Sequence, residues 1–115
     1  MTGESVETFN IGVNTVDVVN FLATEEVFVE GSEMVRRAKT LRAASGLRQA
    51  KLMLNRSGVI PESCDHFDLV FAGARIHSKR IPYLRKVKKN WHLGYGNVNF
   101  DWDDKARLVR FSLLF

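Results

Sequence analysis

The sequence predicts a single α+β domain, in which two or three helices pack on a small antiparallel sheet that ends in a C-terminal β-hairpin. The chain has 115 residues, 45% of them apolar, which suits one domain with one core. Helix-forming residues dominate the middle of the chain, and alternating stretches with turn residues occupy much of the second half. No repeat or linker divides the chain, so residues 1–115 are predicted to form one domain, with 1–13 as an extended arm or edge strand.

The N-terminal part leaves two structures open. Residues 5–13 (SVETFNIGV) alternate in the manner of an edge strand or an extended arm. Asn14 is a candidate cap for a helix over residues 15–26, with Asp17 close to the positive end of that helix. The many β-branched residues of this segment make a strand the alternative. A short strand or turn over residues 27–31 would then lead to Ser32, a good N-cap.

Two short helices are expected between Glu33 and Arg56. The apolar residues before Ser45-Gly46 share one helical face, and those after it share another face about half a revolution away. The dipeptide supplies the break. The pair resembles a helix-turn-helix, but Arg42 lies where the packed helices need a small residue, so a plain helical hairpin is favoured.

A third helix is expected from Pro82 to Trp91. Proline suits the first turn of a helix. Leu84, Val87 and Trp91 would form one apolar stripe, which leaves the basic residues on the outer side.

Strands are expected on both sides of that helix. Residues 66–77 (HFDLVFAGARIH) alternate most clearly. Residues 97–102 and 106–115, joined by the turn DDK, predict the C-terminal hairpin.

The charges are sorted along the chain although the net charge is only +4. Residues 1–33 hold seven acids and no Lys or Arg, and residues 34–60 hold seven bases and no acid. Residues 75–100 again hold seven Lys or Arg and no acid. Such blocks indicate faces of opposite sign, and the alternative is that acidic and basic segments pair across the fold. The acidic third could also cover the basic face in the free protein.

The block from 75 to 100 predicts a small non-enzymatic protein that binds nucleic acid, with RNA or single strands favoured. Cations fixed on a rigid face suit phosphate contacts, and aromatic rings beside them suit base stacking. The predicted nucleic-acid-binding residues are Arg75, Lys79, Arg80, Arg85, Lys86, Lys88, Lys89, His92 and Tyr95. A secondary basic patch consists of Arg36, Arg37, Lys39 and Arg48.

The segment LGYGNVNF resembles the RNP1 motif of RNA-recognition domains. The matching residues are Gly94, Tyr95, Gly96, Val98 and Phe100. Leu93 and Asn97 do not match, and the fifteen residues that follow leave room for one strand rather than the helix and strand of that family. The resemblance therefore implies base stacking on an aromatic platform and no family membership. For Phe100, packing against the helices is the favoured alternative.

Three other functions remain open. A peripheral membrane or matrix-type assembly protein would bind anionic lipid through the same cations, with Trp91 and the C-terminal LLF as anchors. A protein-binding inhibitor would turn the basic face toward an acidic partner. A metal-independent ribonuclease, the minority alternative, would use His77, Lys79, Arg80, Tyr83, Arg85 and His92.

No cofactor or metal is expected. The histidines are scattered, and Cys64 with His66 provides too few donors for a zinc site. A single cysteine, a polar N-terminus and the lack of a long apolar run predict an intracellular, cytoplasmic protein without signal peptide or membrane span. The chain is acidic at its N-terminal end and basic later, which also suits head-to-tail homo-oligomers.

Overall fold

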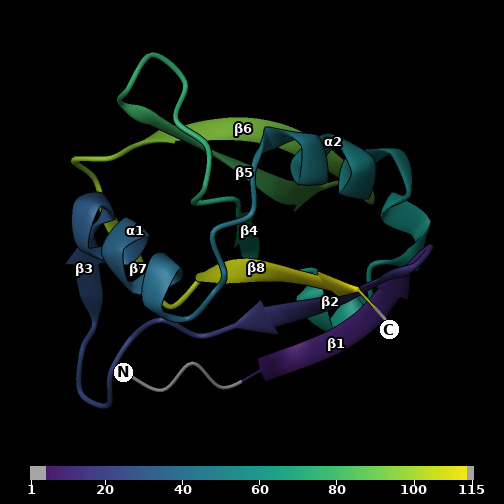
Figure 1. Cartoon of the computed structure of the whole chain (residues 1–115), viewed down its shortest axis with the longest axis horizontal. Coiled ribbons are helices and arrows are strands. Elements are labelled where there is room, and N and C mark those ends of the chain that lie inside the picture. Colours follow the sequence, from purple (N-terminus) through teal and green to yellow (C-terminus); the bar gives the residue numbers. More distant parts are fainter. Residues whose placement is uncertain (1–4, 114–115) are drawn as a thin grey trace.

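The computed structural model describes residues 5–113, and strands dominate it. Of the described residues 43% are strand and 23% helix, so the predicted architecture of two or three helices on a small sheet is wrong. Six strands form one mixed sheet in the order β1-β2-β8-β4-β5-β6 (Figure 1). These strands are β1 (Ser5–Ile11), β2 (Asn14–Val19), β8 (Ala106–Leu113), β4 (Asp68–Val70), β5 (Arg80–Val87) and β6 (Asn90–Asn97). The prediction of an edge strand at the N-terminal end is confirmed by β1.

The last strand, β8, lies inside the sheet instead of in a C-terminal hairpin. It pairs antiparallel with β2 and parallel with β4. The segment expected to be its hairpin partner forms β7 (Asp101–Asp103), which pairs with β3 (Phe28–Glu30) in a separate two-stranded ribbon. This pairing places Trp102 opposite Val29, and both side chains are buried in the core. The predicted C-terminal β-hairpin is therefore wrong.

Two α-helices cover opposite faces of the sheet. Helix α1 (Gly31–Thr40) and helix α2 (Leu47–Asn55) flank the predicted break at Ser45-Gly46, so the prediction of two short helices is confirmed. Single 3₁₀ turns, η1 (Ser57–Val59) and η2 (Glu62–Cys64), follow α2. Figure 1 shows α1 beside the β3–β7 ribbon, and α2 at the other end of the molecule against β5 and β6.

The helix predicted over residues 15–26 is wrong, and the strand alternative is confirmed. Residues 15–19 of this segment belong to β2, and the rest of it lies in a loop that leads to β3. Val16 and Val18 are fully buried, and strands pair with β2 on both sides. β-Branched side chains pack well on a pleated, two-sided surface, and here that preference outweighs the possible cap at Asn14.

The helix predicted from Pro82 to Trp91 is also wrong, because these residues form the hairpin β5–β6. Leu84 and Trp91 reach the core as alternating strand residues rather than as a helical stripe. Pro82 is tolerated because β4 ends beside it. Phe71 donates its backbone N–H to the Pro82 carbonyl. Proline has no N–H with which to bond back, but the pairing of β4 with β5 already ends at Val70 and Tyr83, so no hydrogen bond within that pairing is lost.

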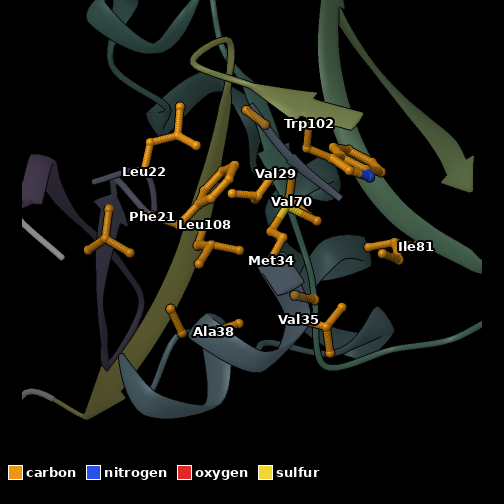
Figure 2. Packing of buried hydrophobic residues seen from close by; sticks show 14 residues of the cluster. Phe21, Leu22, Val29, Met34, Val35, Ala38, Val70, Ile81, Trp102 and Leu108 are labelled. Carbon is orange, nitrogen blue, oxygen red and sulfur yellow. The ribbon is translucent and has the colours of Figure 1, made fainter. Parts of the chain in front are cut away.

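The sheet separates two hydrophobic clusters. The first lies under α1 and includes Phe21, Met34, Val70 and Leu108, which Figure 2 shows packed between the helix and the strands. The second lies under α2 and includes Met53, with strand residues that alternate with those of the first cluster. Each fully buried side chain of this size contributes about 1.5–3 kcal/mol to folding. The hairpin β5–β6 contributes to both clusters, so it is a rigid part of the fold.

Candidate nucleic-acid interface

The hairpin β5–β6 presents cations at both of its ends. At one end Lys88 and Lys89 form the two-residue turn between Val87 and Asn90. Both lysines have positive φ, 51° and 77°, as a type I′ turn requires. Such turns favour Asn and Gly, since a β-carbon in this region costs about 1–2 kcal/mol per residue. The turn therefore tolerates backbone strain in order to carry two lysines.

A second tight turn holds the cations at the other end. Ile76 and Arg80 form an isolated bridge, and His77 and Ser78 between them have φ of 53° and 66°. Lys79 and Arg80 follow directly and are exposed. Because β5 has eight residues at about 3.3 Å each, the two cationic ends lie roughly 25 Å apart.

The predicted basic residues fall into a paired and an unpaired group. Arg85 donates two hydrogen bonds to Asp68, at 2.8 and 2.7 Å, and Lys86 donates to Asp65 at 3.0 Å. No ion pair is found within the described part of the chain for the remaining hairpin cations, which are Arg75, Lys79, Arg80, Lys88 and Lys89. His92 is exposed on β6 opposite Arg85. The hairpin thus keeps positive charge at its two ends and neutralises it in between.

The secondary patch is not one surface. Arg36, Arg37 and Lys39 belong to α1, whereas Arg48 belongs to α2 on the opposite face of the sheet. Lys39 and Arg48 are exposed. Arg36 and Arg37 bond to acids of the N-terminal third, so the positive charge of these two arginines is largely neutralised within the fold.

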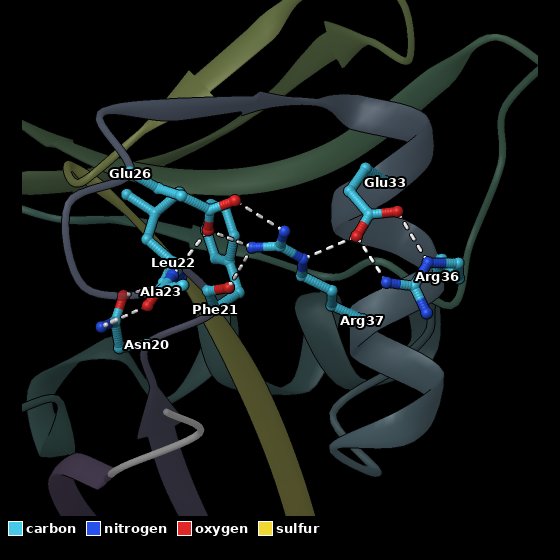
Figure 3. Close-up of polar contacts among 8 residues, drawn as sticks. All are labelled: Asn20, Phe21, Leu22, Ala23, Glu26, Glu33, Arg36 and Arg37. Carbon is cyan, nitrogen blue, oxygen red and sulfur yellow. Dashed lines mark hydrogen bonds and ion pairs between the residues drawn. The ribbon is translucent and has the colours of Figure 1, made fainter. Parts of the chain in front are cut away.

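Arg37 lies at the centre of a polar network that fastens the loop after β2 to α1 (Figure 3). Its side chain is only 11% exposed and donates to both oxygens of Glu26, to Glu33 and to the Phe21 carbonyl. The Arg37 hydrogen bond lowers the pKa of Glu26 to about 2, and the Arg36 hydrogen bond does most to lower the pKa of Glu33 to about 2. These cations therefore have a structural role.

The described acids of β1, β2 and the α1 network do not cover the hairpin. β1 and β2 lie at the far edge of the sheet from β6 (Figure 1), and Glu26 and Glu33 are held by α1. Cover of the basic face by residues 1–33 stays a prediction, because residues 1–4, with Glu4, lie outside the described residues.

Two adjoining hollows lie beside the hairpin, the first toward β7 and the second toward the segment that leads from η2 into β4. The first, which we call the aromatic hollow, has a volume of about 320 Å³. It is lined by Tyr83, Tyr95, Phe100, Trp102, Asp101 and Asp103. The second, the cationic hollow, has a volume of about 410 Å³ and is lined by His66, Phe67, Lys86 and Asp65. Asp68, Arg85 and Lys105 line both, so the two hollows adjoin, and together we call them the groove.

The glycines of the RNP1-like segment let aromatic rings approach the backbone. A β-carbon on Gly94 would lie 2.9 Å from the Tyr83 ring, and one on Gly96 would lie 2.4 Å from the Trp102 ring. Tyr83 and Trp102 in turn meet edge to face, with their ring centroids 6.0 Å apart. The two glycines therefore let the rings of Tyr83 and Trp102 pack against β6, and together they form one wall of the aromatic hollow.

The exposed rings are Tyr95 and Phe100. Tyr95 is 42% exposed and Phe100 59% exposed, and both line the aromatic hollow. The expectation that Phe100 packs in the core is wrong, because Trp102 takes the core position of this segment. Trp91, the expected membrane anchor, is 8% exposed beneath α2, and the residues LLF lie largely outside the described residues.

Sequence reasoning missed three parts of this groove. His66 and Lys105 reach it because β4 and β8 pair in parallel, and the Asp68 N–H bonds the Lys105 carbonyl at 2.8 Å. The carboxylates Asp101 and Asp103 reach it through the ribbon. These pairings join positions far apart in the chain, and the only available signal was the exposed turn DDK.

The arrangement offers little for catalysis. His77 lies beyond one end of β5 and His92 near the other, roughly 17 Å apart by strand rise, so the proposed ribonuclease set is not gathered. Burial raises the pKa of the Cys64 thiol to about 11, which leaves it protonated. Among residues 5–113 no group of three metal-ligating side chains occurs. Over the same range, no helix is long and apolar enough to cross a bilayer.

No protein-family model, curated protein or solved structure matches this chain.

Proposed function

We propose that this protein is a small non-enzymatic, intracellular binder of single-stranded nucleic acid, with RNA favoured. The observation that carries the proposal is the hairpin β5–β6, which carries cations without an ion pair within residues 5–113 at both of its ends and has a groove with exposed aromatic rings beside it. Lysine and arginine side chains without an internal ion pair gain free energy from phosphates through counterion release. Exposed rings beside them add about 1–3 kcal/mol for each stacked base.

The geometry favours a single strand over a duplex. Tyr95 and Phe100 offer ring edges and faces inside a hollow, which only an unstacked base can enter. Neither of the two helices carries a cationic face free of internal ion pairs beside this hollow, as groove insertion into a duplex would need.

An anionic membrane is the second candidate, because Phe28 is 53% exposed on the ribbon beside the groove. Strand pairing, however, places Phe28 on the same side of the ribbon as Glu30, Asp101 and Asp103. Three carboxylates around an inserting phenylalanine repel anionic headgroups, so nucleic acid is the better partner.

The test is a titration of labelled single-stranded RNA, duplex DNA and anionic liposomes with the wild-type protein at two salt concentrations. We expect RNA to bind more tightly than duplex DNA and to weaken as salt rises. Binding to liposomes alone, or to none of the three, would overturn the proposal.

A further inference from the structure

Strand β6 is a free edge of the sheet and lacks the usual protection of such an edge. It ends the strand order on one side, as β1 does on the other. β1 carries Glu7, and its register with β2 shifts between Ser5 and Glu7; charges and bulges both keep an edge from pairing with another chain. β6 (NWHLGYGN) pairs with β5 without a shift and contains no Lys, Arg, Asp, Glu or Pro. This edge is therefore open to a further strand.

The register determines which backbone groups of β6 point outward. The pair that flanks a two-residue turn is hydrogen-bonded, so every second residue of β6, starting at Asn90, bonds to β5. The Val98 N–H, one step beyond the strand, bonds the Lys79 carbonyl at 2.7 Å and continues this series. Pro82, which has no N–H, lies opposite Tyr95, where no bond to β5 is due. The outward backbone groups of β6 belong to Trp91, Leu93, Tyr95 and Asn97.

Three of these four residues leave a row of unused backbone groups. The Asn97 carbonyl accepts the Phe100 N–H and the Trp102 indole N–H. Within residues 5–113, no group bonds the outward N–H and C=O groups of Trp91, Leu93 and Tyr95. They provide three donors and three acceptors in one line. A strand from another chain satisfies this pattern by adding to the sheet.

The side chains at the edge favour apolar neighbours on the side of α2. Trp91 and Leu93 belong to the cluster under α2. By strand alternation Tyr95 lies on the same side, and it is 42% exposed. Aromatic residues pair well with β-branched or aromatic residues of a neighbouring strand. A segment with such residues at every second position therefore fits this edge.

The charge around the edge favours acids at one end of the added segment. Lys88 and Lys89 form the turn before β6 and have no ion pair within residues 5–113. Helix α2, which lies against β5 and β6 (Figure 1), carries Arg48 and Lys51 and no acid. At the opposite end of β6 the chain turns into β7, which begins with the exposed Asp101. Acidic residues are therefore complementary to the turn end alone.

We propose that the free edge of β6 binds an extended segment of a partner protein, which adds to the sheet with alternating apolar residues and ends in acids beside Lys88 and Lys89. The segment runs antiparallel to β6, because antiparallel pairing is the more stable per residue. Its C-terminal end then lies at the turn. The inference goes beyond the proposed function, since it concerns backbone pairing, which a nucleic acid cannot provide.

The test measures hydrogen exchange of single backbone amides by NMR. In the free protein the N–H groups of Leu93 and Tyr95 should exchange fast, and those of His92 and Gly94 slowly. The probe is a short capped peptide in which valine alternates with threonine before two C-terminal glutamates. It should slow exchange at Leu93 and Tyr95 by about tenfold or more. Control peptides with N-terminal glutamates, or with lysines in their place, should bind about fivefold or more weakly.

Two variants of Tyr95 separate the backbone from the side chain. Tyr95→Pro removes an outward N–H that makes no bond to β5, so the fold should persist while peptide binding is lost. Tyr95→Ala keeps this N–H and should weaken binding by about fivefold or less. Lys88→Glu/Lys89→Glu leaves the strand intact and should bind the lysine peptide better than the glutamate peptide, which tests the charge even where Tyr95→Pro does not fold.

Several outcomes would overturn the inference. These are fast exchange at Leu93 and Tyr95 with every peptide, equal binding by Tyr95→Pro and Tyr95→Ala, and a preference for the peptide with N-terminal glutamates. Slow exchange in the free protein together with a concentration-dependent dimer would also overturn it, because a second copy would then fill the edge. Peptide binding without RNA binding would overturn the proposed function alone, and RNA binding without peptide binding would overturn this inference alone.

Discussion

The α1 network and the hairpin β5–β6 both take their cations from basic blocks of the sequence and use them in opposite ways. Arg37 on α1 is nearly buried and bonds two glutamates, whereas Lys88 and Lys89 at the hairpin turn are exposed with no carboxylate partner within residues 5–113. The arginine of the α1 network stabilises the fold, whereas the two lysines of the hairpin turn lie in a strained backbone with positive φ. A run of positive charge therefore indicates function only where the fold leaves it unpaired.

The largest effect on stability should come from Arg37→Ala. The substitution removes the partner of Glu26 and of the Phe21 carbonyl, and hydrogen bonds to charged groups contribute about 1.5–3 kcal/mol. We expect the free energy of unfolding in urea to fall by about 2 kcal/mol, with RNA affinity unchanged. Arg36→Ala is the control, because its side chain is 64% exposed and should cost about 0.5 kcal/mol or less. Equal losses in the two variants would contradict the structural role of Arg37.

Acid should weaken the α1 network next. Glu26 and Glu33 have pKa values of about 2 in the fold, against an ordinary glutamate value of 4.5, chiefly because arginine side chains bond to them. A lowered folded-state pKa means that the stabilisation is complete above about pH 5 and is lost as pH falls toward 2. Urea unfolding between pH 7 and pH 2 should show this loss. The profile of Arg37→Ala should be shallower, and a parallel profile would show that the network does not titrate.

The smallest change in stability, and the sharpest contrast, should come from Lys88→Asn/Lys89→Gly. Asn-Gly suits the positive φ of both turn positions, so the free energy of unfolding should rise by about 1 kcal/mol. RNA affinity should fall because two phosphate contacts are lost. A variant that is more stable and yet binds worse would show that the turn is kept for its charge. Unchanged affinity would mean that these lysines contact nothing.

Some of the fold could be predicted from the sequence because its signals were local. The break at Ser45-Gly46 separated two helices, and the alternation of residues 5–11 predicted an edge strand. The prediction of a helix over residues 82–91 was wrong because the spacing of Leu84, Val87 and Trp91 fits a helical period as well as it fits two strands joined by a turn. The turn itself, Lys88-Lys89, carries neither Asn nor Gly and so gave no signal.

The candidate site was predicted only in part. The basic segment 75–100 was recognised, but its sorting into paired and unpaired cations depends on Asp65 and Asp68, which β4 brings beside β5. Lys105 comes to the groove through the parallel pairing of β4 with β8, a long-range contact that no local pattern shows. The exposed Phe100 could not be told from the buried Trp102, since two aromatics so close in sequence look alike.

The central claim, that the unpaired hairpin cations contact phosphates, is tested most directly by the salt dependence of RNA binding. The wild type would be compared with Lys88→Gln/Lys89→Gln and with Lys51→Gln/Arg56→Gln, which removes one exposed cation from the middle of α2 and one from the residue after its end. For single strands the slope of log affinity against log salt is about −0.7 per phosphate contact. The hairpin variant should lose about 1.4 of that slope and the α2 variant none. Equal slopes for the wild type and the hairpin variant would contradict the claim.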